Sequence, residues 1–148
     1  MENSKSKIIK EIAQELDCGF DCYYNPTTDE IVKIPIFGEM MDEDEFRDAF
    51  GAELKKVKEN KAEFIKIEVL ESFESFKIME RFVSQISDEQ FQAELENILE
   101  RKKPFQNFRN RIDNSDFRQK WFDFKINELE KNVFNQLERG KHYTQQRI

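Results

Sequence analysis

Apolar and polar residues recur with two different periods in the first part of the chain. From residue 7 to residue 16 the apolar positions have the spacing of one helix face. In residues 20–24 and 30–34 the period changes to two, which is the alternation that half-buried strands require. The intervening residues 25–28 include Pro26, whose ring fixes its φ angle in a turn. The pattern therefore predicts a helix followed by a β-hairpin.

Small polar residues and a glycine mark the expected helix ends. Ser4 or Ser6 can cap the start of the first helix, and Gly19 is placed where that helix should stop. A second helical pattern follows Asp42, and Glu45 three residues later resembles a capping arrangement. We therefore expect another helix to begin directly after Asp42.

Residues 64–69 alternate again and predict a third strand, because a two-stranded hairpin alone is only marginally stable in water. After Ser72 the spacing returns to 3.6 and predicts about four helices. Their boundaries are marked by Ser87 with Gln90 as a capping box, Pro104 at a first helical position, Ser115 as a cap and Gly140 at the last end. The fold class that follows is α+β, a small antiparallel sheet of about three strands with an N-terminal helix and a C-terminal run of about four helices.

Length and composition favour one domain. The 148 residues can bury a core without disulfides or metals, and 15 Phe offset a modest number of aliphatic residues. No Pro-, Gly- or Ser-rich linker divides the chain. We predict a single domain over residues 1–148, with a disordered tail at residues 141–148 that lacks periodicity.

Charge is unevenly distributed along the chain. The net charge of −7 argues against non-specific binding to nucleic acid or to an anionic membrane. Residues 1–100 have a net charge of −13, whereas residues 101–148 have a net charge of +6. The start of the chain is polar and no apolar run is long enough to cross a bilayer, so we expect a cytoplasmic protein without membrane partners.

Residue sets for catalysis are missing from the pattern. The one histidine, His142, falls in the predicted tail, and the four glycines are isolated from one another. Cys18 and Cys22 are expected to be reduced thiols, because two cysteines cannot build a disulfide scaffold or a four-ligand zinc site. Pairs of carboxylates such as Glu11 and Glu15 arise by chance among 31 acidic residues. We therefore predict no catalytic residues, no metal site and no cofactor.

Segment 101–125 is the sharpest candidate for binding, because its cations interleave with aromatic residues. Such a mixture can neutralise phosphates and stack bases in a single-stranded nucleic-acid surface. The alternative, which we favour, is that the rings fill the core and the cations are solvated or pair with the acidic first hundred residues. The candidate binding residues are Arg101, Lys102, Lys103, Arg109, Arg111, Arg118, Trp121 and Phe124.

Glu80 is the one carboxylate that we single out. It lies beside Met79 and Val83, which are expected to face inward, and a buried carboxylate needs a partner. We predict a structural ion pair between Glu80 and a cation of the basic segment, with Arg109 and Arg111 as candidates.

Several short motifs in order resemble a known family. They are Phe76–Phe82 (FKIMERF), Pro104–Arg109 (PFQNFR), Trp121–Phe124 (WFDF) and the hairpin segment from Tyr24 to Ile31. Together they resemble the bacterial uncharacterised protein family numbered 0158. The resemblance implies a small cytoplasmic bacterial protein without an assigned activity, and it lends no catalytic residues.

These observations lead to a functional hypothesis. We expect a non-catalytic protein-interaction or regulatory module that binds a protein partner or a second copy of itself, since oppositely charged segments favour salt-sensitive association. The alternative is binding of RNA or single-stranded DNA through residues 101–125. A metal-dependent hydrolase built on carboxylates ranks below both.

Overall fold

The computed structural model describes the backbone of residues 2–35 and 42–146, and the side chains of residues 5–35 and 42–140. The chain divides into two compact units. Unit 1 comprises Met1–Val69 with Leu129–Ile148, and unit 2 comprises Leu70–Glu128. The expectation of a single domain over residues 1–148 stays a prediction.

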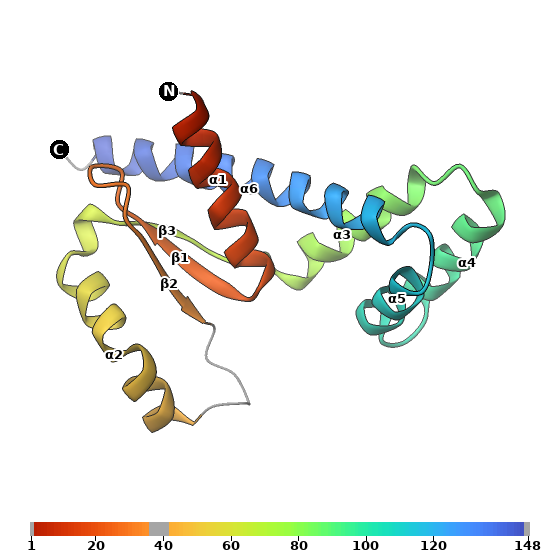
Figure 1. The fold of residues 1–148 in the computed structure, drawn as a ribbon, viewed down its shortest axis with the longest axis horizontal. Helices are drawn as coiled ribbons and strands as arrows, with labels where there is room; N and C mark the ends of the chain where they lie inside the picture. Colours follow the sequence, from red (N-terminus) through yellow and green to blue (C-terminus); the bar gives the residue numbers. More distant parts are fainter. Residues whose placement is uncertain (1, 36–41, 147–148) are drawn as a thin grey trace. The chain divides into compact units, whose positions relative to one another are not determined.

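Unit 1 is built on a three-stranded antiparallel sheet (Figure 1). Its strands are β1 (Phe20–Tyr24), β2 (Ile31–Pro35) and β3 (Ile65–Ile67), in the order β2-β1-β3. The predicted hairpin and third strand are confirmed. Strand β3 ends earlier than predicted because the Val69 N–H donates to Asp21 Oδ1 at 2.9 Å instead of to a strand carbonyl.

Helix α1 (Glu2–Asp17) covers one face of this sheet. The pairing register places Cys22 opposite Lys33 on β2 and Ile67 on β3, so these three residues share a face. Helix α1 packs against β1, and its Glu15 pairs with Lys33 at 3.3 Å. The helix begins at Glu2, before the serines that were predicted to cap it, and Gly19 follows its end with φ of 91°.

The last part of helix α6 (Arg118–Gln146) packs on β3 in unit 1. The Gln136 side-chain amide donates to the Glu68 carbonyl and accepts from the Glu68 N–H, at 3.1 and 3.0 Å, as a neighbouring strand would. Gly140 lies so close to Ile65 that an added Cβ would be 3.3 Å from both Cβ and Cγ1 of that side chain. Gly140 therefore serves close packing, and the prediction that the helix ends there is wrong because α6 continues to Gln146.

The turn between β1 and β2 is held by side-chain hydrogen bonds. Buried Asn25 accepts with Oδ1 from the Thr27 and Thr28 N–H groups at 2.9 and 3.3 Å. The Tyr24 hydroxyl donates to Asp29 Oδ1 at 2.6 Å, and Asp29 has a left-handed φ of 62°. Burial and this hydrogen bond raise the pKa of Tyr24 to about 12.

Helix α2 (Glu43–Glu59) packs against β2 and is followed by the 3₁₀ turn η1 (Lys61–Glu63). The predicted cap is confirmed, since Asp42 Oδ1 accepts from the Glu45 N–H at 2.8 Å. Lys56 forms an ion pair with Glu30 beside β2. No residue of α2 is fully buried, so one long side of the helix is open to solvent.

Unit 2 is entirely helical in its described secondary structure. It contains α3 (Ser72–Ser84), α4 (Glu89–Glu100), α5 (Pro104–Asp113) and the first residues of α6, so the run of about four helices is confirmed. Pro104 occupies the first turn of α5 as predicted. The cap of α4 is Asp88 and not Ser87, because Asp88 Oδ1 accepts from the Phe91 N–H at 3.1 Å. Ser115 accepts from the Phe117 N–H in a turn before α6.

The core of unit 2 is rich in aromatic rings. Phe108, only 1% exposed, meets Trp121 edge-on with ring centres 5.0 Å apart, and Phe82 meets the same indole at 5.2 Å. Such edge-to-face contacts add to the free energy of burying the rings. The buried members of this core are Met79, Phe82, Val83, Ile86, Phe91, Leu95, Phe108 and Ile112.

Candidate interaction surface

The loop between α4 and α5 presents three consecutive cations. Arg101 leaves α4 in an extended conformation, and Lys103 has a left-handed φ of 53° directly before Pro104. The Asn107 side chain donates to the Lys102 carbonyl at 3.0 Å, and the Asn107 N–H donates to the Lys103 carbonyl at 3.1 Å. The backbone of the loop is thus fastened to the first turn of α5 while its long side chains remain exposed.

Arg111 is engaged within unit 2. Its Nε lies 2.6 Å from Glu94 Oε1 and its Nη2 lies 3.2 Å from Glu94 Oε2, which is a bidentate pair. The guanidinium also lies 4.8 Å from the centre of the Phe91 ring. This hydrogen bonding lowers the pKa of Glu94 and raises that of Arg111. The cation is therefore used to join α4 and α5.

Three other cations of segment 101–125 also have neighbours. Arg118 lies 3.9 Å from Asp113, a loose ion pair between exposed side chains. Lys120 lies 5.5 Å from the centre of the Phe117 ring. Lys125 lies 5.8 Å from the ring centres of Trp121 and Phe122.

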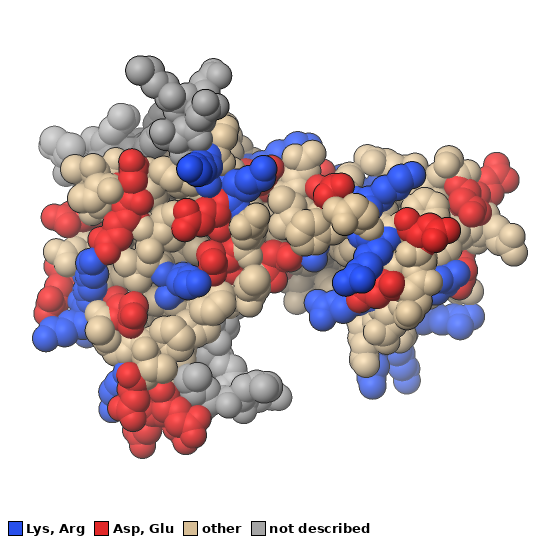
Figure 2. Space-filling model, viewed as in Figure 1, with Lys and Arg blue, Asp and Glu red and all other residues tan. Residues whose placement is uncertain are grey.

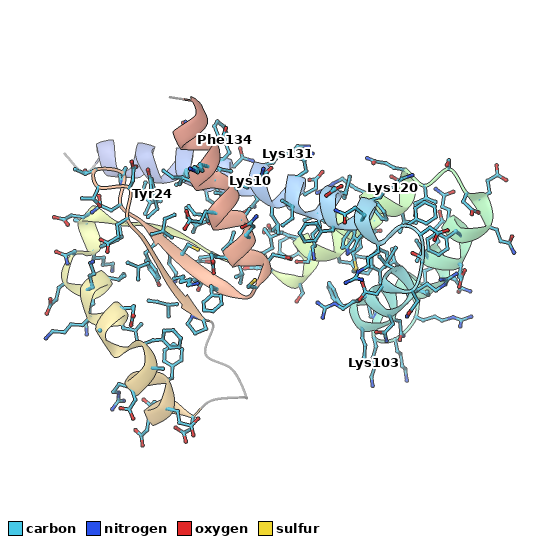
Figure 3. All side chains as sticks on the ribbon, viewed as in Figure 1. Lys10, Tyr24, Lys103, Lys120, Lys131 and Phe134 are labelled. Carbon is cyan, nitrogen blue, oxygen red and sulfur yellow. The ribbon has the colours of Figure 1, made fainter. Side chains whose placement is uncertain are left out.

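The remaining cations are Arg101, Lys102, Lys103 and Arg109, which we call the basic edge. All four side chains are exposed, and none takes part in an ion pair within the described part of the chain. Figure 3 shows the Lys103 side chain projecting away from α5, and Figure 2 shows Lys and Arg atoms gathered at the same place. Of the eight predicted binding residues, Arg101, Lys102 and Lys103 are thus adjacent in this loop, and Arg109 follows them on α5.

The two aromatic residues among the predicted binding residues belong to the core. Trp121 and Phe124 are partly buried and pack against the core cluster of unit 2, with Phe124 at 5.4 Å from Phe82. We favoured the interpretation that these two rings belong to the core, and this interpretation is confirmed. Neither ring is free to serve as an open stacking platform for a base.

Phe105 is the exposed ring beside the basic edge. We favoured the interpretation that the rings of segment 101–125 fill the core, and for Phe105 this interpretation is wrong because its ring is 43% exposed. It lies in the first turn of α5, and its ring meets Phe76 of α3 edge-on at 6.3 Å. Phe73 of α3, which is not among the predicted binding residues, is 56% exposed.

The prediction of a buried Glu80 is wrong, because its side chain is exposed. Successive helix residues are rotated by about 100°, so the residue after inward-facing Met79 turns out of the core. The expected partner Arg111 pairs with Glu94, and the other candidate, Arg109, is itself exposed. The pair that ties α3 to α6 within unit 2 is instead Arg81 with Glu128, at 2.9 Å.

The charge division along the sequence is not preserved in the fold. Unit 2 combines the acidic α3 and α4 with the basic α5 and the start of α6, and holds ten Lys or Arg and twelve Asp or Glu. Unit 2 as a whole therefore carries no excess of positive charge.

Two thiols and the possible metal ligands are the remaining groups with potential chemical function. Cys18 and Cys22 form no disulfide in the described part of the chain, and burial raises the pKa of Cys22 to about 12. Within the described residues, no three His, Cys, Asp or Glu side chains are grouped as metal ligands. The side chain of His142 lies outside the described residues. None of the helices described here has the length and apolar character needed to span a membrane.

Fold and surface together define a class of α+β protein in which a small antiparallel sheet is combined with a helical unit that carries a basic edge. The chain belongs to the Uncharacterised protein family (UPF0158), whose model matches residues 4–145. The family resemblance is thus confirmed, and the family has no assigned function. No curated protein and no solved structure matches the chain.

Proposed function

We propose that this chain is a non-catalytic protein-interaction or regulatory module of the bacterial cytoplasm, and that it binds an acidic protein partner through the basic edge. The supporting observation is that Arg101, Lys102, Lys103 and Arg109 are exposed and lack an ion pair within the described residues. Carboxylates of a partner would neutralise them, and complementary charge of this kind speeds association and selects the partner.

The exposed ring of Phe105 adds an apolar contact to this surface. Interfaces commonly place an aromatic anchor among charged residues that lie towards the rim. Charge alone gives weak, salt-screened attraction, so the ring is expected to contribute to affinity and the cations to steering.

An acidic protein fits this surface better than a single-stranded nucleic acid does. Successive bases stack on several open aromatic faces, whereas Trp121 and Phe124 pack on the core of unit 2 and Phe105 alone is an exposed ring beside the basic edge. Arg111, a cation of segment 101–125, forms an ion pair with Glu94 and is not available to a phosphate. Nucleic-acid binding is therefore the alternative result that the experiment can detect.

The test is capture from a bacterial lysate on the immobilised chain, with captured proteins identified by mass spectrometry. The variant is Lys102→Glu with Lys103→Glu. The control is Lys7→Glu with Lys10→Glu on exposed positions of α1, which changes the net charge equally. We expect the wild type and the control to capture a protein that the variant loses, and cross-links from Lys103 to reach an acidic segment of it.

Two outcomes would contradict this proposal. If nuclease treatment of the lysate abolished capture, the basic edge would be a nucleic-acid surface. If the variant captured the same proteins as the wild type in equal amounts, the basic edge would have no part in binding.

A further inference from the structure

The densest acidic run of the chain, Asp42 to Glu45, forms the N-cap and the first turn of helix α2. Along its exposed side Asp48, Ala49 and Ala52 lie three, four and seven residues after Glu45, so the four residues share one face of the helix. Two carboxylates and two methyl groups therefore form a continuous exposed surface. We call these four residues and the adjacent Asp44 the acidic strip.

The carboxylates of this strip are not used within the described part of the chain. Asp42 caps the helix and Glu43 pairs with Arg47, at 3.2 Å. The side chains of Asp44, Glu45 and Asp48 take part in no ion pair among the described residues. The carboxylates of the acidic strip, like the cations of the basic edge, therefore have no ion-pair partner among the described residues.

We propose that the acidic partner of the basic edge is the acidic strip of α2 in a second copy of this chain, an inference that rests on the proposed function above. Both surfaces combine charge with an apolar contact. Carboxylates of the strip would meet the cations of the edge, and the small Ala49 and Ala52 would let the Phe105 ring approach the helix closely.

The dimensions of the two surfaces agree. Lys103 and Arg109 are six residues apart in or beside α5, which corresponds to about 9 Å along a helix axis. Asp44 and Ala52 are eight residues apart in α2, or about 12 Å. Both surfaces thus extend over about two helical turns.

Helix α2 can bind to the basic edge of a second copy because its outer side makes no contacts that build the described part of unit 1. It contributes no fully buried residue and contacts the sheet through β2. Docking of its outer side would leave these contacts intact, so association requires no unfolding of either copy.

The experiment is sedimentation velocity over a range of protein concentrations at about 10 mM and about 500 mM salt. The edge variant is Lys102→Glu with Lys103→Glu, and the strip variant is Asp44→Lys with Asp48→Lys. Circular dichroism and thermal unfolding verify that each variant is folded. The control is again Lys7→Glu with Lys10→Glu.

We expect the wild type and the control to associate at low salt and to lose at least about tenfold in affinity at high salt. Each charge-reversal variant alone should lose at least about tenfold in affinity, because like charges then face each other. An equimolar mixture of the two variants should associate again, since the intact strip of one meets the intact edge of the other.

Two results would overturn this inference: a wild type that is monomeric at every concentration in low salt, or a mixture of variants that fails to associate. A monomeric wild type that still captures another protein through the basic edge would reject the second copy and retain the proposed function. Loss of both self-association and edge-dependent capture would reject the two together.

Discussion

Glu94 of α4 accepts two hydrogen bonds from Arg111 of α5, a residue 17 positions further along the chain. The pair lies at the surface of unit 2, and the Arg111 guanidinium rests over the Phe91 ring, whose side chain is buried. One interaction thus links a surface charge pair to the core, and it removes one cation from the set that a partner could use.

The first prediction concerns the pH dependence of this pair. Because the pair lowers the pKa of Glu94, its stabilising effect is present above the ordinary value of 4.5 and is lost as the pH falls through the lowered value. Glu94→Gln should therefore lower the melting temperature at neutral pH, and its difference from the wild type should shrink below about pH 4.

Thermal unfolding between neutral and acidic pH measures this difference. Glu96→Gln is the control, because Glu96 is exposed on the same helix and has no ion pair among the described residues. A difference for Glu94→Gln that stayed constant into acid would mean that the ionised pair does not stabilise unit 2.

The second prediction contrasts two helical glycines. Gly140→Ala should destabilise by about 1–3 kcal/mol, because the new methyl group would overlap the Ile65 side chain on β3. Gly51→Ala in α2 should stabilise by about 0.5–1 kcal/mol, since its nearest neighbour is Arg47 Cγ at 3.9 Å and alanine favours the helix. Urea unfolding gives both values, and a neutral Gly140→Ala would contradict the close packing of α6 on β3.

Regular periodicity explains why the fold was accessible from the sequence. The alternation in residues 20–24 and 30–34 reflects two strands that each bury one side, with Cys22 and Tyr24 on β1 and Val32 and Ile34 on β2, so the hairpin could be predicted from neighbouring residues alone. The cap at Asp42 is equally local, because its acceptor atom and the Glu45 N–H are three residues apart.

The candidate site was less accessible because it depends on which charges find partners. Nothing near Arg111 in the sequence indicates that Glu94 neutralises it, since only the packing of α4 on α5 brings them together. The burial of Glu80 was predicted wrongly because it is one helical step of about 100° away from inward-facing Met79. The burial of Phe105 was predicted wrongly because a residue in the first turn of a helix is less covered than its periodic neighbours. Burial at helix ends and long-range ion pairing are tertiary properties.

The third prediction separates the two cysteines. Cys22 is fully buried and burial raises its pKa to about 12, whereas Cys18 is exposed. The thiolate is the reactive form, so native protein at about pH 8 should be alkylated at Cys18 only. Mass spectrometry after iodoacetamide treatment measures this, with urea-unfolded protein as the control in which both residues react. Equal labelling in native protein would contradict the burial of Cys22 beneath α1.

The last prediction distinguishes a core ring from a surface ring three residues apart on α5. Phe108→Ala should destabilise by about 3–5 kcal/mol, because it removes a ring that is 1% exposed and leaves a cavity beside Trp121. Phe105→Ala should cost less than about 1 kcal/mol, because the ring is 43% exposed. Trp121, the one tryptophan of the chain, reports unfolding by its fluorescence in urea.

The same pair of variants separates folding from association. If Phe105→Ala retains stability but weakens self-association at low salt, its ring acts at the surface of the basic edge. If Phe105→Ala instead destabilises unit 2 as strongly as Phe108→Ala does, the ring belongs to the core and the apolar part of the proposed interface is wrong.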